Sequence, residues 1–180
     1  NVEARAPGEL TKMLAQGGVT LLPVAQYRKW FDGLPQPFRE MVNARWGVPE
    51  KAELMTWTSP EGKKFFVIPG FRLENIFVGP QLLRASFAEY TKVQHSSTLP
   101  PHHGYVASYL FYRHQLQADA ILHMGRHGTL EWLPGKNVGQ AGWDSSEVIL
   151  GDLPNVNYYI MDGDGEALQA RRRSAAVDIS

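Results

Sequence analysis

The segment that decides the fold is residues 118–136, ADAILHMGRHGTLEWLPGK. Its first five residues, 118–122, are mostly apolar, too short a run for a helix, and lead directly into His123. The preceding segment, residues 104–116, has apolar residues at helical spacing. A helix followed by a buried strand is half of a βαβ unit. The segment therefore predicts an α/β protein with a parallel or mixed sheet flanked by helices, and His123 at the carboxyl end of a central strand.

The rest of the chain fits the same class. Further strands are expected at residues 19–22, 64–68, 75–78 and 155–161, and helices at 25–31, 37–46 and from Glu166 to the end of the chain. The link at residues 69–74 suits a hairpin or a loop between neighbouring strands. These elements divide the chain into a helical entry segment at residues 1–60 and an α/β core at residues 61–180, which carries the motif.

Composition narrows the possible functions. The 18 basic and 18 acidic side chains cancel, so the chain lacks the positive charge that nucleic-acid binding usually requires. Cysteine is absent, which excludes disulfides, iron–sulfur ligation and thiol nucleophiles. Any metal chemistry must therefore use His, Asp or Glu.

The sequence also bears on location and length. No apolar run approaches the roughly 20 residues that span a bilayer, and Asn1 opens a polar segment rather than a signal peptide, so the cytoplasm is the expected location. Asn1 is not an initiator Met, and the expected last helix has no Gly or Pro terminator. We expect an excised piece of a longer protein.

Two histidines and a glutamate, His123, His127 and Glu131, are spaced four residues apart. A strand that ends in this motif delivers both imidazoles at the carboxyl edge of the sheet, where open α/β sheets bind ligands. Gly125 and Gly128 permit a sharp turn and a close approach of the backbone to a flat ligand. Glu131 is expected on the first turn of a short helix that begins near residue 129, facing the same crevice.

The three side chains form a ligand set for a divalent first-row metal that needs no sulfur. Because glycines interrupt the segment, it is not the helical His-Glu-x-x-His zinc motif. The residues alone leave two interpretations open. Either the three side chains carry metal or proton-transfer chemistry, or His123 is a hydrogen-bonded core histidine and Glu131 is a charge stabilised by the start of a helix.

The chain resembles the large subunit of cobaltochelatase (CobN) and the related H subunit of magnesium chelatase. The most specific match is the string Gly-Thr-Leu-Glu-Trp-Leu-Pro-Gly-Lys at residues 128–136. Other matching stretches are residues 27–47, 75–81, 101–105, 118–127, 151–156 and 165–173, so the resemblance covers nearly the whole chain. Arg126 departs from the family, whose members commonly have threonine there.

The resemblance implies an excerpt of a much larger, multidomain subunit, the large, tetrapyrrole-binding subunit of an ATP-dependent chelatase. Its expected substrates are a divalent metal and a macrocycle, with Co²⁺ and a corrin-type macrocycle of cobalamin biosynthesis favoured by the Glu-Trp-Leu-Pro wording at residues 131–134. Residues 154–159 are more similar to the magnesium branch, so Mg²⁺ insertion into protoporphyrin IX is the alternative. A non-catalytic tetrapyrrole-binding module and a His/Glu metallohydrolase are the rival classes.

The resemblance also implies that ATP is hydrolysed on separate AAA+ partner subunits. This agrees with the sequence, which has no Gly-x-x-x-x-Gly-Lys-Ser/Thr phosphate loop. The fragment alone is therefore expected to be inactive.

Roles for individual residues follow from the same resemblance. Glu131 is expected to accept protons and deliver the metal transiently, with His123 and His127 as metal ligands or as its orienting partners. Contacts to the macrocycle are expected from His103, Tyr105, Trp132, Lys136 and Arg172. The structural alternatives are a helix cap for His103, core packing for Trp132 and a solvated helix face for Arg172.

Overall fold

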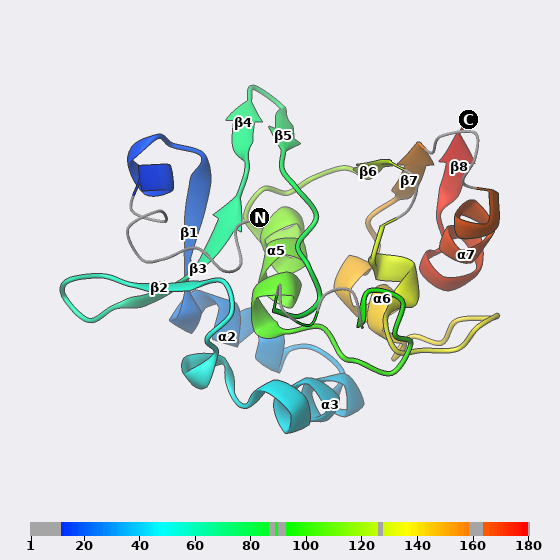
Figure 1. Ribbon diagram of the computed structural model, residues 1–180, viewed down its shortest axis with the longest axis horizontal. Helices are drawn as coiled ribbons and strands as arrows, with labels where there is room; N and C mark the ends of the chain where they lie inside the picture. The colour runs from blue at the N-terminus through cyan, green and yellow to red at the C-terminus, as the bar shows by residue number, and fades with distance from the viewer. Residues whose placement is uncertain (1–11, 87–88, 90–92, 126–127, 159–163, 180) are drawn as a thin grey trace.

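The computed structural model describes residues 12–86, 89, 93–125, 128–158 and 164–179 (Figure 1). It is a mixed α/β structure. Among the described residues, an antiparallel sheet lies on one side of the central helix α5 (His103–His114), a parallel sheet lies on the other, and a hairpin lies above the helix in the view of Figure 1. The expected class, α/β with a parallel or mixed sheet and flanking helices, is confirmed.

The antiparallel sheet has the order β1-β3-β2. Its strands are β1 (Val19–Pro23), β2 (Thr56–Thr58) and β3 (Lys64–Pro69), and the accompanying helices are α2 (Val24–Asp32), α3 (Gln36–Trp46) and the 3-10 turn η1 (Pro49–Lys51). Apolar side chains of α2 and α3 at helical spacing, Tyr27, Phe31, Phe38 and Val42, enter the core. The helices end at Gly33 and Gly47, as the sequence predicts.

Both segments of the expected division at residue 60 contribute to this sheet. β1 and β2 come from the first segment and pair with β3 from the second. β2 was not expected from the sequence. The link after β3 forms β4 (Phe71–Leu73), which pairs with β5 (Ile76–Val78) as a hairpin.

Helix α5 (His103–His114) is the centre of the core. Every residue from His103 to Phe111 is buried, because the helix packs against β3, α2 and α6 (Ser145–Leu150). Gly104 allows α5 to lie close to Met55, because a Cβ on residue 104 would lie 2.6 Å from Met55 Cβ. Within the described ranges, no helix is long and apolar enough to cross a membrane.

The parallel sheet consists of β6 (Ile121–Met124), β7 (Asn155–Tyr158) and β8 (Val177–Ile179), in that order. The connection from β6 to β7 contains the 3-10 turn η2 (Leu130–Trp132) and α6, and α7 (Asp164–Ser174) connects β7 to β8. His123 lies in β6, one residue before the strand ends. The expectation of a central strand is wrong for the described sheet, because β7 is central and β6 lies at the edge.

The last element also differs from the sequence prediction. The expected helix stops at Ser174, and β8 follows it. Ala175 ends the helix with φ 48°, a left-handed conformation that glycine usually supplies at this position. Because an alanine gives no such signal in the sequence, the helix was predicted to run on to the end of the chain.

The two faces of the parallel sheet differ in character. Leu122, Met124 and Tyr158 point to one face, where they are 56%, 75% and 47% exposed. His123 is opposite Asn157 in the register and points to the other face, toward α7 and η2. Strands of parallel sheets usually carry apolar residues on both faces. The face that α7 and η2 cover departs from this pattern, because His123 and Asn157 on it are polar. These two residues belong to the candidate site described below.

Candidate functional site

The motif forms a strand, a turn and a short helix. β6 ends at Met124, Gly125 follows with φ 153°, and η2 begins at Leu130. This agrees with the expected order of elements, and it places Glu131 in η2. Arg126 and His127 lie outside the described residues, so the structure does not place this expected metal ligand.

His123 and Glu131 line the same small cavity. The cavity has a volume of about 10 Å³, which is room for about one water molecule. Its other polar walls come from Asn155 and Asn157 of β7 and from Ser174 of α7. Two of the three expected chemical groups are thus brought together on the helix-covered side of β6.

Glu131 is buried, with 3% of its surface exposed. Its Oε1 accepts a hydrogen bond from the Gly128 backbone N–H at 2.9 Å. Two buried cations, Arg84 and Arg173, lie close enough for its charge to raise their pKa values. Burial has the opposite and larger effect, lowering the pKa of Arg84 to about 10 and lowering that of Arg173. The carboxylate therefore lies in an enclosed, positively charged environment.

His123 is a partly buried histidine with an unusual environment. Its Nε2 atom is buried and has no hydrogen-bond partner among the described residues. Burial lowers the pKa of His123 to about 4, so its imidazole is neutral near pH 7. Neutral imidazole is the form that ligates metals. The described residues give Nε2 no hydrogen bond, and the role of His123 stays a prediction.

Tyr105 anchors the motif from α5. Its side chain is fully buried, and its hydroxyl lies 3.0 Å from Thr129 Oγ1. Burial raises the pKa of Tyr105 to about 12, so the hydroxyl keeps its proton. Gln81, which follows β5, accepts from the Thr129 backbone N–H at 2.7 Å. Tyr105 was expected to contact the macrocycle, but in this structure it packs in the core beneath the motif.

Arg173 rather than Arg172 reaches the motif. Arg173 is 4% exposed and donates to the Leu133 carbonyl at 2.7 Å and to the Asn137 side chain. Arg172, which was expected to contact the macrocycle, is exposed. The sequence shows three consecutive arginines and does not distinguish the buried one, because its burial depends on how α7 packs against η2.

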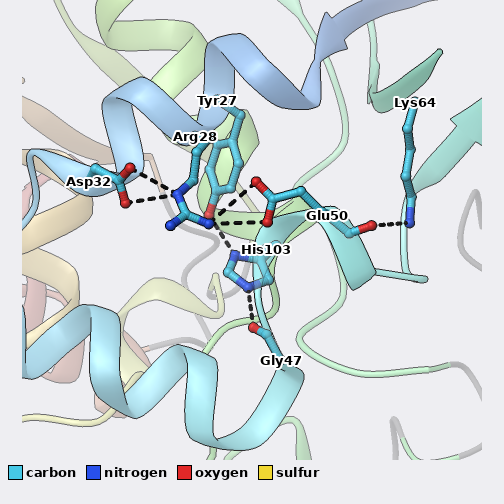
Figure 2. A network of polar contacts seen from close by, with 7 residues as sticks. All are labelled: Tyr27, Arg28, Asp32, Gly47, Glu50, Lys64 and His103. Atoms are coloured by element: carbon cyan, nitrogen blue, oxygen red, sulfur yellow. Dashed lines mark hydrogen bonds and ion pairs between the residues drawn. The ribbon is translucent and has the colours of Figure 1, made fainter.

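His103 is held in the core away from this cavity. Figure 2 shows its ring between Tyr27 and Gly47, with Nδ1 2.8 Å from the Tyr27 hydroxyl and Nε2 2.8 Å from the Gly47 carbonyl. Because a carbonyl only accepts, Nε2 carries the hydrogen and Nδ1 accepts from Tyr27. The neighbouring His102, rather than His103, caps α5, since its Nδ1 accepts from the Tyr105 N–H. Both nitrogens of His103 are therefore used within the fold.

The remaining two expected residues lie nearer the surface. Trp132 packs against His95, with ring centroids 4.7 Å apart, and its buried Nε1 has no hydrogen-bond partner in the described part of the chain. Lys136 is exposed, with its ammonium 5.5 Å from the centre of the Trp143 ring. No three His, Asp or Glu side chains among the described residues are grouped so that they could hold a metal ion, and the expected triad includes His127, which lies outside them.

Acid is expected to destabilise the fold through His103. Burial lowers the pKa of its folded ring from 6.5 to about 4, so between these values only the unfolded state binds the proton. The free energy of unfolding should therefore fall as the pH is lowered, by up to about 1.4 kcal/mol per pH unit for this group. Urea titrations at several pH values test this by comparing the parent chain with His103→Leu. The variant should show a shallower pH dependence, and equal slopes would contradict a neutral His103.

Comparisons with known proteins identify the family of this chain. The sequence model of the CobN/Magnesium Chelatase family matches residues 2–180. The aerobic cobaltochelatase subunit CobN of Pseudomonas aeruginosa is 38% identical over 188 residues, covering 96% of this chain and 15% of that protein. The chloroplastic magnesium-chelatase subunit ChlH of Oryza sativa subsp. indica is 34% identical over 143 residues, covering 79% of this chain and 10% of that protein.

A solved structure gives the same relationship. The catalytic subunit of cobaltochelatase from Mycobacterium tuberculosis superposes with a TM-score of 0.78 and 32% sequence identity, over 96% of this chain and 15% of that one. The chain thus spans only about 15% of the length of these cobaltochelatase relatives. Because the sequence match extends over residues 2–180 and the fold agrees, the chain belongs to the CobN/magnesium chelatase family.

Proposed function

We propose that this chain is part of the large, tetrapyrrole-binding subunit of an ATP-dependent chelatase, and that its motif carries out the insertion of Co²⁺ into a corrin-type macrocycle in cobalamin biosynthesis. The observation that carries the proposal is the shared cavity of Glu131 and His123, where a buried carboxylate faces the same space as an imidazole whose Nε2 has no hydrogen-bond partner among the described residues. Cobalt is favoured because the two CobN relatives are 38% and 40% identical, against 34% and below for the magnesium-chelatase subunits.

The chemistry needs both kinds of group. Metal insertion must remove water from the metal ion and two N–H protons from the macrocycle. Glu131 is suited to accept a proton and to hold a dication transiently, because its carboxylate is a base and an oxygen ligand. His123 offers a neutral nitrogen ligand at pH 7, and His127 is proposed as the second one.

The size of the cavity adds a requirement. A space of about 10 Å³ admits one water and is far too small for a macrocycle. We therefore expect the cavity to open when substrate binds, and the macrocycle to lie over the opened motif. ATP hydrolysis on AAA+ partner subunits is the proposed source of energy for the reaction.

Reconstitution tests the function. The full-length subunit would be combined with its AAA+ partners, ATP and a corrin-type macrocycle, and metal insertion followed by absorbance with Co²⁺ and, separately, with Mg²⁺ and protoporphyrin IX. The proposal expects ATP-dependent insertion of Co²⁺ into the corrin-type macrocycle. Insertion of Mg²⁺ into protoporphyrin IX instead would establish the magnesium alternative. Binding of either macrocycle without insertion would show a non-catalytic tetrapyrrole-binding module.

A further inference from the structure

We infer that Gln81 is a positioning residue for Glu131, an inference that rests on the proposed function. Gln81 lies in the segment after β5, and 48 positions separate it from Thr129, its partner in the motif. Its side-chain amide joins the motif to the central helix α5. Gln81 does not line the cavity and acts through the backbone on which Glu131 depends.

The Gln81 amide makes hydrogen bonds in two directions. Oε1 accepts from the Thr129 backbone N–H at 2.7 Å. Nε2 donates to the Tyr109 hydroxyl at 2.8 Å and, more weakly, to the Tyr105 hydroxyl at 3.3 Å. Both tyrosines lie in the buried part of α5, so they provide a fixed support. The amide therefore transmits the position of α5 to the backbone of the motif.

Gly128, the residue before Thr129, connects this support to Glu131. The Gly128 N–H donates to Glu131 Oε1 at 2.9 Å. A Cβ at Gly128 would lie 2.9 Å from Gln81 Oε1 and 3.2 Å from Glu131 Oε2. The ends of the Gln81 and Glu131 side chains thus lie next to each other at Gly128, and a larger residue there would require one of them to shift. Displacing Gln81 would release the peptide N–H of Thr129, which is adjacent to the peptide N–H of Gly128 that donates to the Glu131 carboxylate.

An amide is the group that this position requires. It must accept from a backbone N–H and donate to a hydroxyl at the same time, which a glutamine side chain does and an apolar one does not. Burial raises the pKa of Tyr105 to about 12 and that of Tyr109 well above its ordinary value, so both hydroxyls stay neutral. A neutral amide also adds no second negative charge beside Glu131.

The test uses the full-length subunit with its AAA+ partners, ATP and macrocycle. Gln81→Met keeps the approximate length of the side chain and removes both hydrogen bonds. We expect kcat for metal insertion to fall by about 10- to 100-fold, because small errors in the position of a reacting group are costly, while KM for the macrocycle changes by less than about twofold. Gln115→Met is the matched control, since Gln115 is exposed at the end of α5. It should retain the parental kcat.

A second variant keeps the inference testable if Gln81→Met fails to fold. Tyr109→Phe removes only the hydroxyl that supports Gln81 and should lower kcat about threefold or more. The double variant should be no slower than Gln81→Met alone, because both changes act through one chain of hydrogen bonds. Three results would each overturn the inference. They are a double variant in which the two losses of kcat multiply, a variant that loses macrocycle affinity while kcat is retained, and an unchanged kcat in the single variants.

The outcome also separates this inference from the proposed function. If Glu131→Gln is inactive and Gln81→Met is fully active, Gln81 has no positioning role and the proposed function stands. If Glu131→Gln inserts metal at the parental rate, the proposed function of the motif fails, whatever Gln81→Met does.

Discussion

Replacing Glu131 by glutamine in the full-length subunit is expected to lower the rate of metal insertion by at least about 100-fold while tetrapyrrole binding stays within about twofold of the parent. Glutamine keeps the shape and can still accept the hydrogen bond from the Gly128 N–H. It cannot accept a proton or neutralise an approaching dication. Binding should survive because the macrocycle offers a large apolar face whose burial does not depend on this charge. Insertion assays and macrocycle titration, each in the presence of the partners and ATP, measure the two effects.

A control variant at a carboxylate outside the motif makes this result specific. Glu53→Gln makes the same chemical change at an exposed carboxylate outside the motif, and it should leave the insertion rate unchanged. Parental insertion by Glu131→Gln would show that Glu131 is a structural residue and would move the proposed chemistry to the histidines.

Replacing His123 by leucine is expected to separate function from stability. The buried Nε2 has no hydrogen-bond partner among the described residues, so replacing the ring breaks no hydrogen bond between this atom and a described group. Leucine is an apolar side chain of similar size, and the free energy of unfolding should change by less than about 1.5 kcal/mol. Metal insertion should fall by at least about tenfold, because a proposed metal ligand is lost. Thermal unfolding and the insertion assay on the full-length subunit test both effects.

His103 provides the contrasting case for the same substitution. Burial lowers the pKa of both histidines to about 4, but each nitrogen of His103 has a partner. His103→Leu would leave the Tyr27 hydroxyl and the Gly47 carbonyl without these bonds, and should destabilise the protein by about 2–4 kcal/mol. If instead His123→Leu is as destabilising as His103→Leu, His123 is a structural residue of the core.

Local patterns in the sequence predicted most of the fold. The periodic apolar residues of α2, α3 and α5 identified these helices, and Gly33 and Gly47 identified two of their ends. The apolar run before His123 predicted the strand that became β6, although the strand begins at Ile121, three residues later than expected. β2 and β8 are only three residues long and gave no usable period.

The supporting groups of the site were beyond such patterns. The role of Gln81 depends on a contact across 48 positions of the sequence, and nothing local distinguishes this glutamine from the exposed Gln115. The burial of Arg173 and the exposure of Arg172 depend on the orientation of α7. The motif itself was visible because its glycines and chemical side chains are adjacent in the chain, whereas the groups that hold it come from α5, α7 and the segment after β5.

A structure of the full-length subunit with macrocycle and divalent metal bound would test the central claim most directly. We predict that the motif opens, that the macrocycle lies over it, and that the Glu131 carboxylate and His123 Nε2 face the metal, with the carboxylate oxygen at a bonding distance of about 2 Å before insertion is complete. A macrocycle bound elsewhere, with Glu131 still enclosed against the Gly128 N–H and His123 still buried beneath α7, would contradict the assignment of this motif as the site of metal insertion.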